Sequence, residues 1–104
     1  YIADPLCGYV CTTGFFQEFM KGLANLNKNV KKVPLNLPIH IMSGAQDPVG
    51  EMGKGVKALE KMYKDHNIRD VDMILYEGGR HEMLNEINRK TVMNDIYTWI
   101  NKHI

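Results

Sequence analysis

Two short apolar runs, each followed by a glycine-containing turn and a helical pattern, constrain the fold of this chain more than any other feature. The first lies within a strand predicted over Leu35 to Ser43, and the second runs from Val71 to Tyr76. Short runs that are apolar on both faces are typical of parallel strands covered by helices. A helical pattern between them predicts a right-handed crossover that joins two parallel strands. The predicted fold class is therefore α/β.

Three helical patterns accompany the strands and give the predicted order helix, strand, helix, strand, helix. Apolar residues recur at three- and four-residue spacing from Phe15 to Leu26, and a polar loop is predicted over residues 27–32. The middle helix is predicted from Val49 to Asn67, which ends it. The inward face of the last helix is expected to carry Val92, Ile96, Trp99 and Ile100.

The first helix carries an aromatic stripe that allows two interpretations. Phe15, Phe16 and Phe19 could line a pocket for an acyl chain. A stripe at helical spacing is more often part of a hydrophobic core, and we prefer that interpretation.

Length and charge exclude several classes of protein. The 104 residues correspond to one small domain. The net charge is +1, with 13 basic and 12 acidic residues interspersed, whereas a nucleic-acid-binding domain would need a basic patch. No apolar run approaches the roughly 20 residues that span a bilayer, and the first residues lack the features of a signal peptide. We therefore expect neither a nucleic-acid partner nor a transmembrane segment.

The two cysteines, Cys7 and Cys11, are too few for a four-ligand zinc site, and no histidine follows at zinc-finger spacing. We prefer two free, partly buried thiols to a disulfide. Seven methionines and so few cysteines suit a reducing compartment. The expected localisation is therefore cytoplasmic.

Two parallel strands do not make a stable sheet by themselves. An unpaired strand edge presents a row of free N–H and C=O groups that recruits another strand. We therefore expect the chain to belong to a larger doubly wound domain, or its sheet to be completed by a second copy.

The candidate site consists of an acid after the first strand and a base after the second. Asp47 follows the strand that ends at Ser43, and His81 follows the strand that ends at Tyr76. Open α/β sheets place their chemistry beyond the carboxyl ends of their strands. A carboxylate that accepts a hydrogen bond from an imidazole fixes its tautomer and stabilises the imidazolium formed during proton transfer.

Each of these residues also has a purely structural interpretation. Asp47 before Pro48 fits the N-cap and first position of a helix, and His81 could be a solvated loop histidine. His40, within the first strand, is expected to be a hydrogen-bonded core histidine. A zinc site at His81 is excluded because position 85 is Asn rather than the second His of a His-Glu-x-x-His motif.

Two motifs in the right order resemble the C-terminal part of α/β-hydrolases. They are Ser-Gly-Ala-Gln-Asp-Pro-Val-Gly at 43–50 and Tyr-Glu-Gly-Gly-Arg-His-Glu-Met-Leu-Asn-Glu at 76–86, followed by a terminal helix with Trp99. The group that the chain resembles is that of lysophospholipase and monoacylglycerol-lipase-like serine hydrolases. Residues 1–30 resemble the end of the cap or lid region of that family, and 31–104 the C-terminal part of its catalytic domain.

This resemblance implies that Asp47 is the acid and His81 the base of a Ser–Asp–His triad, in which the serine comes first in the chain. No Gly-x-Ser-x-Gly motif occurs here, and the sole serine, Ser43, stands at a strand end. The nucleophile is thus expected upstream, and this segment alone is expected to be inactive. The intact enzyme would cleave a carboxylic ester of a lipid-like acyl group without a metal or cofactor, and the sequence leaves an amide or thioester substrate open. Residues Glu82, Asn85 and Glu86 are expected to cap the last helix.

The alternative hypothesis is a small non-catalytic α/β binding module, in which Asp47 and His81 serve as a cap and a surface residue. A Gly-x-Ser-x-Gly motif upstream in the parent gene would favour the enzyme over the module.

Overall fold

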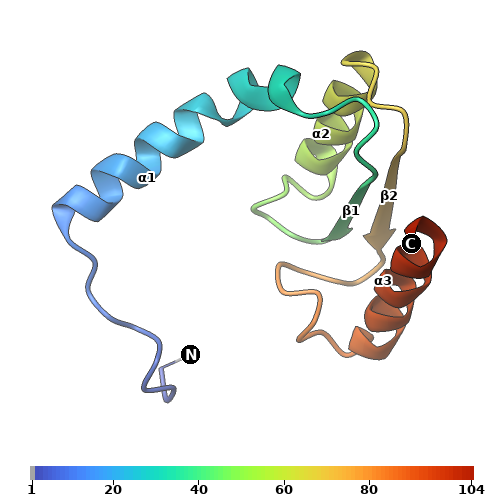
Figure 1. Ribbon diagram of the computed structural model, residues 1–104. Coiled ribbons are helices and arrows are strands. Elements are labelled where there is room, and N and C mark those ends of the chain that lie inside the picture. The colour runs from blue at the N-terminus through green and yellow to red at the C-terminus, as the bar shows by residue number, and fades with distance from the viewer. Residues whose placement is uncertain (1) are drawn as a thin grey trace. The chain divides into compact units, whose positions relative to one another are not determined.

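The computed structural model of the chain describes residues 2–104, without the side chain of Asn27, and forms two compact units, Tyr1–Val30 and Lys31–Ile104 (Figure 1). The elements in order are α1 (Thr13–Asn25), the 3₁₀ helix η1 (Leu26–Lys32), β1 (Ile39–Gly44), α2 (Lys54–Asp65), β2 (Val71–Tyr76) and α3 (Arg89–His103). The strands β1 and β2 pair in parallel, with Ile39 opposite Val71 and Gly44 opposite Tyr76. The predicted α/β class with parallel strands is confirmed.

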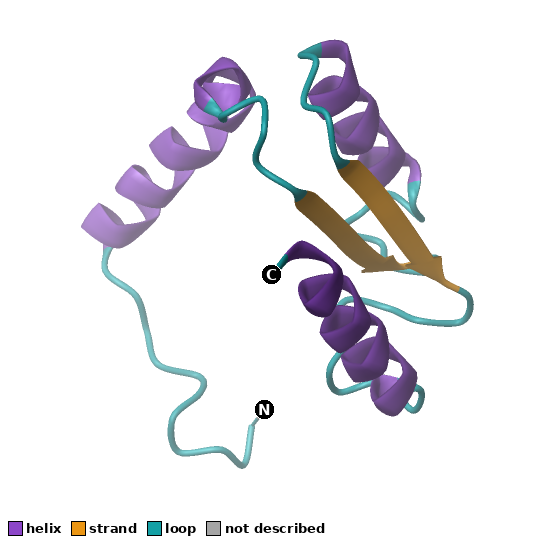
Figure 2. Ribbon diagram, turned by 45° about the vertical axis from the view of Figure 1, so that its right-hand side comes forward, coloured by secondary structure: helices purple, strands orange, loops and turns teal. Residues whose placement is uncertain are grey.

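In the second unit, α2 and α3 cover opposite faces of the sheet (Figures 1 and 2). His40 and Ile74 face α3, whereas Leu75 contacts the start of α2 at Gly53. This division follows from the strand geometry, in which successive side chains point to opposite faces. The buried centre between the sheet and α3 consists of Tyr76, Met83 and Val92, against which Met42, Ile74 and Ile96 pack.

The middle helix begins later than predicted. It starts at Lys54 rather than Val49, because Glu51, Met52 and Gly53 all have positive φ angles. A helix cannot pass through three successive left-handed residues. A Cβ atom on Gly53 would lie 3.0 Å from a methyl carbon of Leu75, so the glycine also makes room for the sheet. At the other end, Asn67 adopts a left-handed conformation (φ 61°) and its N–H bonds to the carbonyl of Lys64, which ends the helix as predicted.

Three other expectations are wrong in detail. The polar loop predicted over 27–32 is part of η1. The strand β1 begins at Ile39 rather than Leu35, because residues 34–37 form a turn in which the Leu37 N–H bonds to the carbonyl of Pro34. On α3, Val92 is fully buried, but Ile100 is 44% exposed within the described residues.

The aromatic stripe of α1 is not core in the described residues. Thr12 caps this helix by accepting the N–H of Phe15, and the helix starts at Thr13, two residues before the predicted apolar pattern. No residue of α1 is buried, and Phe15, Phe16 and Phe19 are each about half exposed. Phe15 and Phe19 stack on each other with ring centroids 5.9 Å apart. The first unit is therefore a helix with an uncovered apolar face.

Candidate active site

The loops that follow β1 and β2 are joined at the carboxyl end of the sheet. Beyond the last paired residues, the Ala45 N–H donates to the carbonyl of Tyr76 and the Gln46 N–H donates to the carbonyl of Gly79, both at 2.9 Å. A Cβ atom on Gly44 would lie 2.1 Å from the carbonyl carbon of Gly79. Only glycine permits this approach of two backbones. The loops that follow the two strands therefore lie side by side.

Asp47 is a buried residue of the first loop rather than a helix cap. Its Oδ1 accepts the N–H of Val49 at 2.9 Å, and its carbonyl accepts the N–H of Met52 at 2.9 Å. The N-cap position of α2 belongs to Gly53, six residues later. The interpretation of Asp47 as an N-cap is therefore wrong, because the left-handed turn separates it from the helix.

The structure brings Asp47 and His81 together, as the strand order predicted. His81 Nδ1 lies 3.0 Å from Asp47 Oδ2. The carboxylate side chain is 7% exposed, whereas the imidazole is 63% exposed. Because an ionised carboxylate only accepts, the Nδ1 proton belongs to His81 in this bond. The other ring nitrogen, Nε2, is then left as an unprotonated acceptor on an accessible ring.

Each member of the pair shifts the pKa of the other. The hydrogen bond from His81 lowers the pKa of the Asp47 carboxyl, although burial alone would raise it. The hydrogen bond to Asp47, and then the charge of that carboxylate, raise the pKa of His81, while burial opposes this. The pair thus combines a carboxylate that stays ionised near neutral pH with an imidazole of increased proton affinity. This combination is suited to accepting and returning a proton.

The residues expected to cap the last helix have other roles. The N-cap of α3 is Asn88, which makes no side-chain capping bond. Glu86 Oε1 instead accepts the N–H of Arg80 at 2.7 Å, and the Asn85 amide bonds to Glu82. The caps were mispredicted because α3 begins at Arg89, several residues after the motif. The loop-closing contact of Glu86 could not be read from the sequence, since it depends on the turn geometry.

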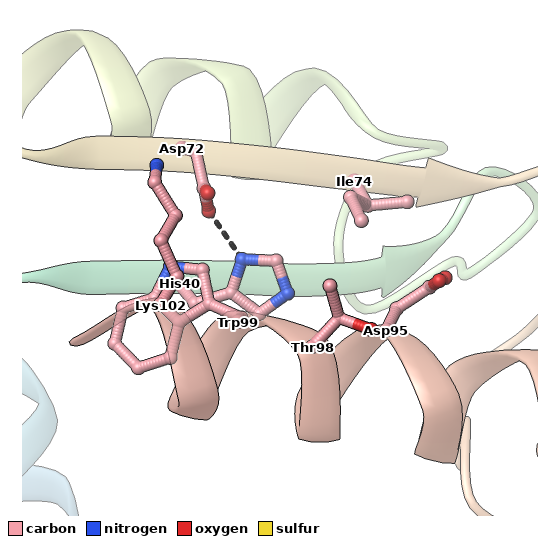
Figure 3. Close-up of a pocket in the computed structure, with 7 residues that line it drawn as sticks. All are labelled: His40, Asp72, Ile74, Asp95, Thr98, Trp99 and Lys102. Atoms are coloured by element: carbon pink, nitrogen blue, oxygen red, sulfur yellow. Dashed lines mark hydrogen bonds and ion pairs between the residues drawn. The ribbon is translucent and has the colours of Figure 1, made fainter. Parts of the chain in front are cut away.

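A second group of histidines and aspartates lies toward the amino ends of the strands (Figure 3). His40 Nδ1 bonds to Asp72 Oδ1, and the His40 ring stacks on Trp99 with centroids 5.3 Å apart. Trp99 also contacts His103, at 4.2 Å between centroids, and His103 Nε2 lies 2.8 Å from Asp70 Oδ2. We call these five residues the His–Trp–His stack. His40 and Asp72 occupy paired positions of β1 and β2, a register that the structure shows and the sequence analysis did not predict.

The His–Trp–His stack borders a cavity of about 220 Å³, lined by His40, Asp72, Ile74, Asp95, Thr98, Trp99 and Lys102 (Figure 3). His40 is buried as expected, but its Nε2 has no hydrogen-bond partner within residues 2–104, so the histidine is only half satisfied. At the edge of the cavity, the hydroxyl of Tyr76 donates to Asp95 at 2.8 Å. Burial, followed by this bond, raises the pKa of Tyr76 to about 12. Tyr76 therefore remains protonated as a donor.

Within 2–104, no group of three or more His, Cys, Asp or Glu residues is arranged to hold a metal ion. The helices of the same residues include none that is long and apolar enough to cross a bilayer. Cys7 and Cys11 are free and partly buried.

A parallel αβα unit with an acid and a histidine after successive strands is the C-terminal architecture of an α/β hydrolase. The family model described as "Serine aminopeptidase, S33" matches residues 1–88, and the chain belongs to this α/β-hydrolase family. No curated protein matches the sequence.

Among solved structures, the chain is similar to a highly thermostable carboxyl esterase from Bacillus coagulans, crystallised in complex with glycerol. The TM-score is 0.88 at 28% sequence identity, and the match covers 97% of this chain. It covers 34% of the esterase chain, so the sequence spans about a third of the length of that protein.

Proposed function

We propose that this chain supplies the acid and the base of a serine esterase, with Asp47 orienting His81 and His81 transferring the proton. The observation that carries the proposal is the 3.0 Å contact between a buried carboxylate and an accessible imidazole at the carboxyl ends of parallel strands. Membership of a hydrolase family and the similarity to a carboxyl esterase support the same reaction class. The nucleophilic serine would come from the rest of the gene product, as would the oxyanion hole.

In the proposed reaction, His81 Nε2 takes the serine proton as the serine oxygen bonds to the ester carbonyl carbon. The bond to the alcohol then breaks, and the departing alkoxide takes the proton from His81. In the second half, water gives a proton to His81 and its oxygen to the acyl carbon. The serine oxygen leaves with that proton, which releases the carboxylic acid and restores the enzyme.

The substrate that we propose is a carboxylic ester with a lipid-like acyl group, as in lysophospholipids and monoacylglycerols. This rests on the resemblance of the two loop motifs to that group of hydrolases. The uncovered apolar face of α1, with three half-exposed phenylalanines, provides a surface that an acyl chain or a covering segment would bury.

The test uses the complete gene product that contains this sequence. Nitrophenyl esters of increasing acyl length, a lysophospholipid and an aminoacyl nitroanilide are assayed side by side, since the family description names an aminopeptidase. Ester turnover that rises with acyl length supports the proposal. Turnover of the anilide alone would replace it with an aminopeptidase, and a protein inert toward all of them and toward a serine-directed phosphonate would favour the binding module.

We also propose that the sheet formed by the described residues is completed by another strand, either from the same gene product or from a second copy. Within residues 2–104 the sheet has only two strands, so β1 and β2 each have one edge without a partner strand. The isolated segment 1–104 should therefore self-associate or melt without a sharp transition. Sedimentation that shows a compact monomer with a cooperative melt would contradict this expectation.

A further inference from the structure

Glu86 closes the loop that carries His81. Its Oε1 accepts the backbone N–H of Arg80, the residue directly before His81, at 2.7 Å across six positions of sequence. A hydrogen bond from a backbone N–H to an ionised carboxylate is shorter and stronger than one between neutral groups. Glu86 is only partly exposed, and it borders a small cavity together with Gly78 and Gly79. The carboxylate is therefore directed back at its own loop.

The backbone of Glu86 is bonded to the start of α3. The carbonyl of Glu86 accepts the N–H of Arg89, the first residue of α3, at 3.1 Å. One turn later Val92 is fully buried in the core, and Met83 within the loop is buried in the same cluster. The Glu86 side chain thus connects Arg80 to a part of the molecule that the core holds in place.

The Gly79–Arg80 peptide group, one peptide before His81, is held through both its carbonyl and its N–H. The carbonyl of Gly79 accepts the N–H of Gln46 from the first loop, and the N–H of Arg80 is held by Glu86. The His81 ring itself is mostly exposed, and within residues 2–104 its one side-chain hydrogen bond goes to Asp47. Its orientation therefore depends on the backbone that delivers it, rather than on packing around the ring.

We infer that Glu86 is a positioning residue for His81, which holds the Arg80 peptide so that the imidazole meets Asp47. The inference rests on the proposed function for its catalytic consequence, but the positioning itself concerns only the His81–Asp47 contact. Glu86 touches neither His81 nor Asp47, and it acts through the Arg80 N–H. A misplacement of a reacting group by about 1 Å can cost on the order of a hundredfold in rate.

Two substitutions separate the hydrogen bond of Glu86 from its charge. Glu86→Gln removes the charge but keeps an oxygen that can accept the Arg80 N–H. Glu86→Asp keeps the charge, but it is one methylene shorter and cannot reach the same position. Glu77→Gln is the matched control, because it removes one carboxylate from the same loop at an exposed position for which the structure shows no side-chain hydrogen bond.

The experiment follows the titration of His81 in the complete gene product by NMR of carbon-labelled histidine, with His81→Gln used for assignment. Because the bond to Asp47 is the main cause of the raised pKa of His81, loosening the loop should lower that pKa. We expect Glu86→Asp to lower the pKa and to reduce kcat about tenfold to a hundredfold with little change in KM. Glu86→Gln and Glu77→Gln should remain close to the wild type in both measurements.

The inference is overturned if His81 titrates as in the wild type in Glu86→Asp, or if Glu86→Gln lowers the pKa while Glu86→Asp does not. The second result would mean that charge acts instead of the hydrogen bond. The NMR titration needs no activity. A lowered His81 pKa in a protein whose His81→Ala variant hydrolyses esters normally would therefore retain the positioning role and reject the proposed function.

Discussion

The two ends of the sheet both pair histidine with aspartate, but with opposite burial. At the carboxyl end the carboxylate of Asp47 is buried and the imidazole of His81 is 63% exposed. At the amino end the imidazoles of His40 and His103 are 8% and 12% exposed, whereas their aspartate partners are each 44% exposed.

This inversion supports the proposal that the carboxyl end is the site of chemistry and the amino end a structural contact. A base must reach its substrate, so its ring has to be accessible, while a buried carboxylate can fix the ring from behind. At the amino end the arrangement is reversed, because the imidazole is buried and the carboxylate is exposed. The ring of His40 fills space and stacks on Trp99, and Asp72 only bonds to one of its nitrogens. A His–Asp contact alone therefore does not indicate catalysis, and the proposed role of His81 depends also on the accessibility of its ring.

We expect the largest difference between the two ends of the sheet in the turnover of variants at each end. In the complete gene product, His81→Ala should lower kcat by about four orders of magnitude or more, because proton transfer to and from the nucleophile is lost. His40→Ala at the opposite end should leave kcat within several-fold of the wild type in the fraction that remains folded. Active-site titration with a phosphonate supplies that fraction. Near-normal turnover by His81→Ala would remove His81 from the mechanism.

The second contrast concerns the pH dependence of activity. His81 must be neutral to act as a base, so kcat/KM should fall as the pH falls through its pKa. Asp47 raises that pKa, so Asp47→Asn should move the acid limb of the profile to lower pH, together with a loss of kcat of about 10⁴.

The control for this profile is Asp72→Asn, which alters the buried histidine at the other end and should leave the acid limb in place. An acid limb that stays where it is in Asp47→Asn would show that another group controls the profile.

The sequence was sufficient to predict the part of the site that depends on strand order. Two apolar runs in a parallel unit place Asp47 and His81 at one edge whatever the details of their loops, and the structure has them in contact. Their catalytic role stays a prediction. What could not be predicted depends on backbone conformations without a periodic signal. The left-handed turn at Glu51 and Met52 delays α2, and it also removes the helix cap that had been the rival interpretation of Asp47.

The His–Trp–His stack could not be predicted for a different reason. His103 and Asp70 are 33 residues apart, on α3 and just before β2, and no local pattern connects them. Only the packing of α3 on the sheet brings Trp99 to His40 and His103 to Asp70. Similarly, the Phe-rich face of α1 has the periodicity of a core helix, but periodicity does not say which surface covers it.

The third contrast is in stability, where the amino end should matter more. His40→Ala removes a buried ring that stacks on Trp99, so it should lower the free energy of unfolding by about 1 to 3 kcal/mol. His66→Ala is the control, because His66 is exposed at the C-cap of α2 and its ring makes only one contact, 3.1 Å from Nδ1 to the Met62 carbonyl, so it should change stability by less, about 1 kcal/mol at most. Denaturant unfolding of the complete gene product measures both. Equal effects of the two variants would mean that the stack contributes nothing.

The smallest expected effect is a pH dependence of stability from His103. The bond to the Trp99 carbonyl, and then the bond to Asp70, raise the pKa of His103. A histidine whose pKa is raised in the folded state contributes stability that is fully present below its unfolded pKa, about 6.5. That contribution is lost as the pH rises through the folded pKa.

Asp70→Asn should therefore lower the Tm relative to the wild type in mild acid and much less at alkaline pH. Even in mild acid, the loss of stability should be smaller than the loss in His40→Ala. Asp65→Asn removes a charge from an exposed aspartate paired with Lys61, and its effect should be the same across this pH range. A Tm difference for Asp70→Asn that is equally large in acid and alkali would show that Asp70 contributes a hydrogen bond without its charge. The two ends of the sheet would then differ only in which partner of each His–Asp pair is buried.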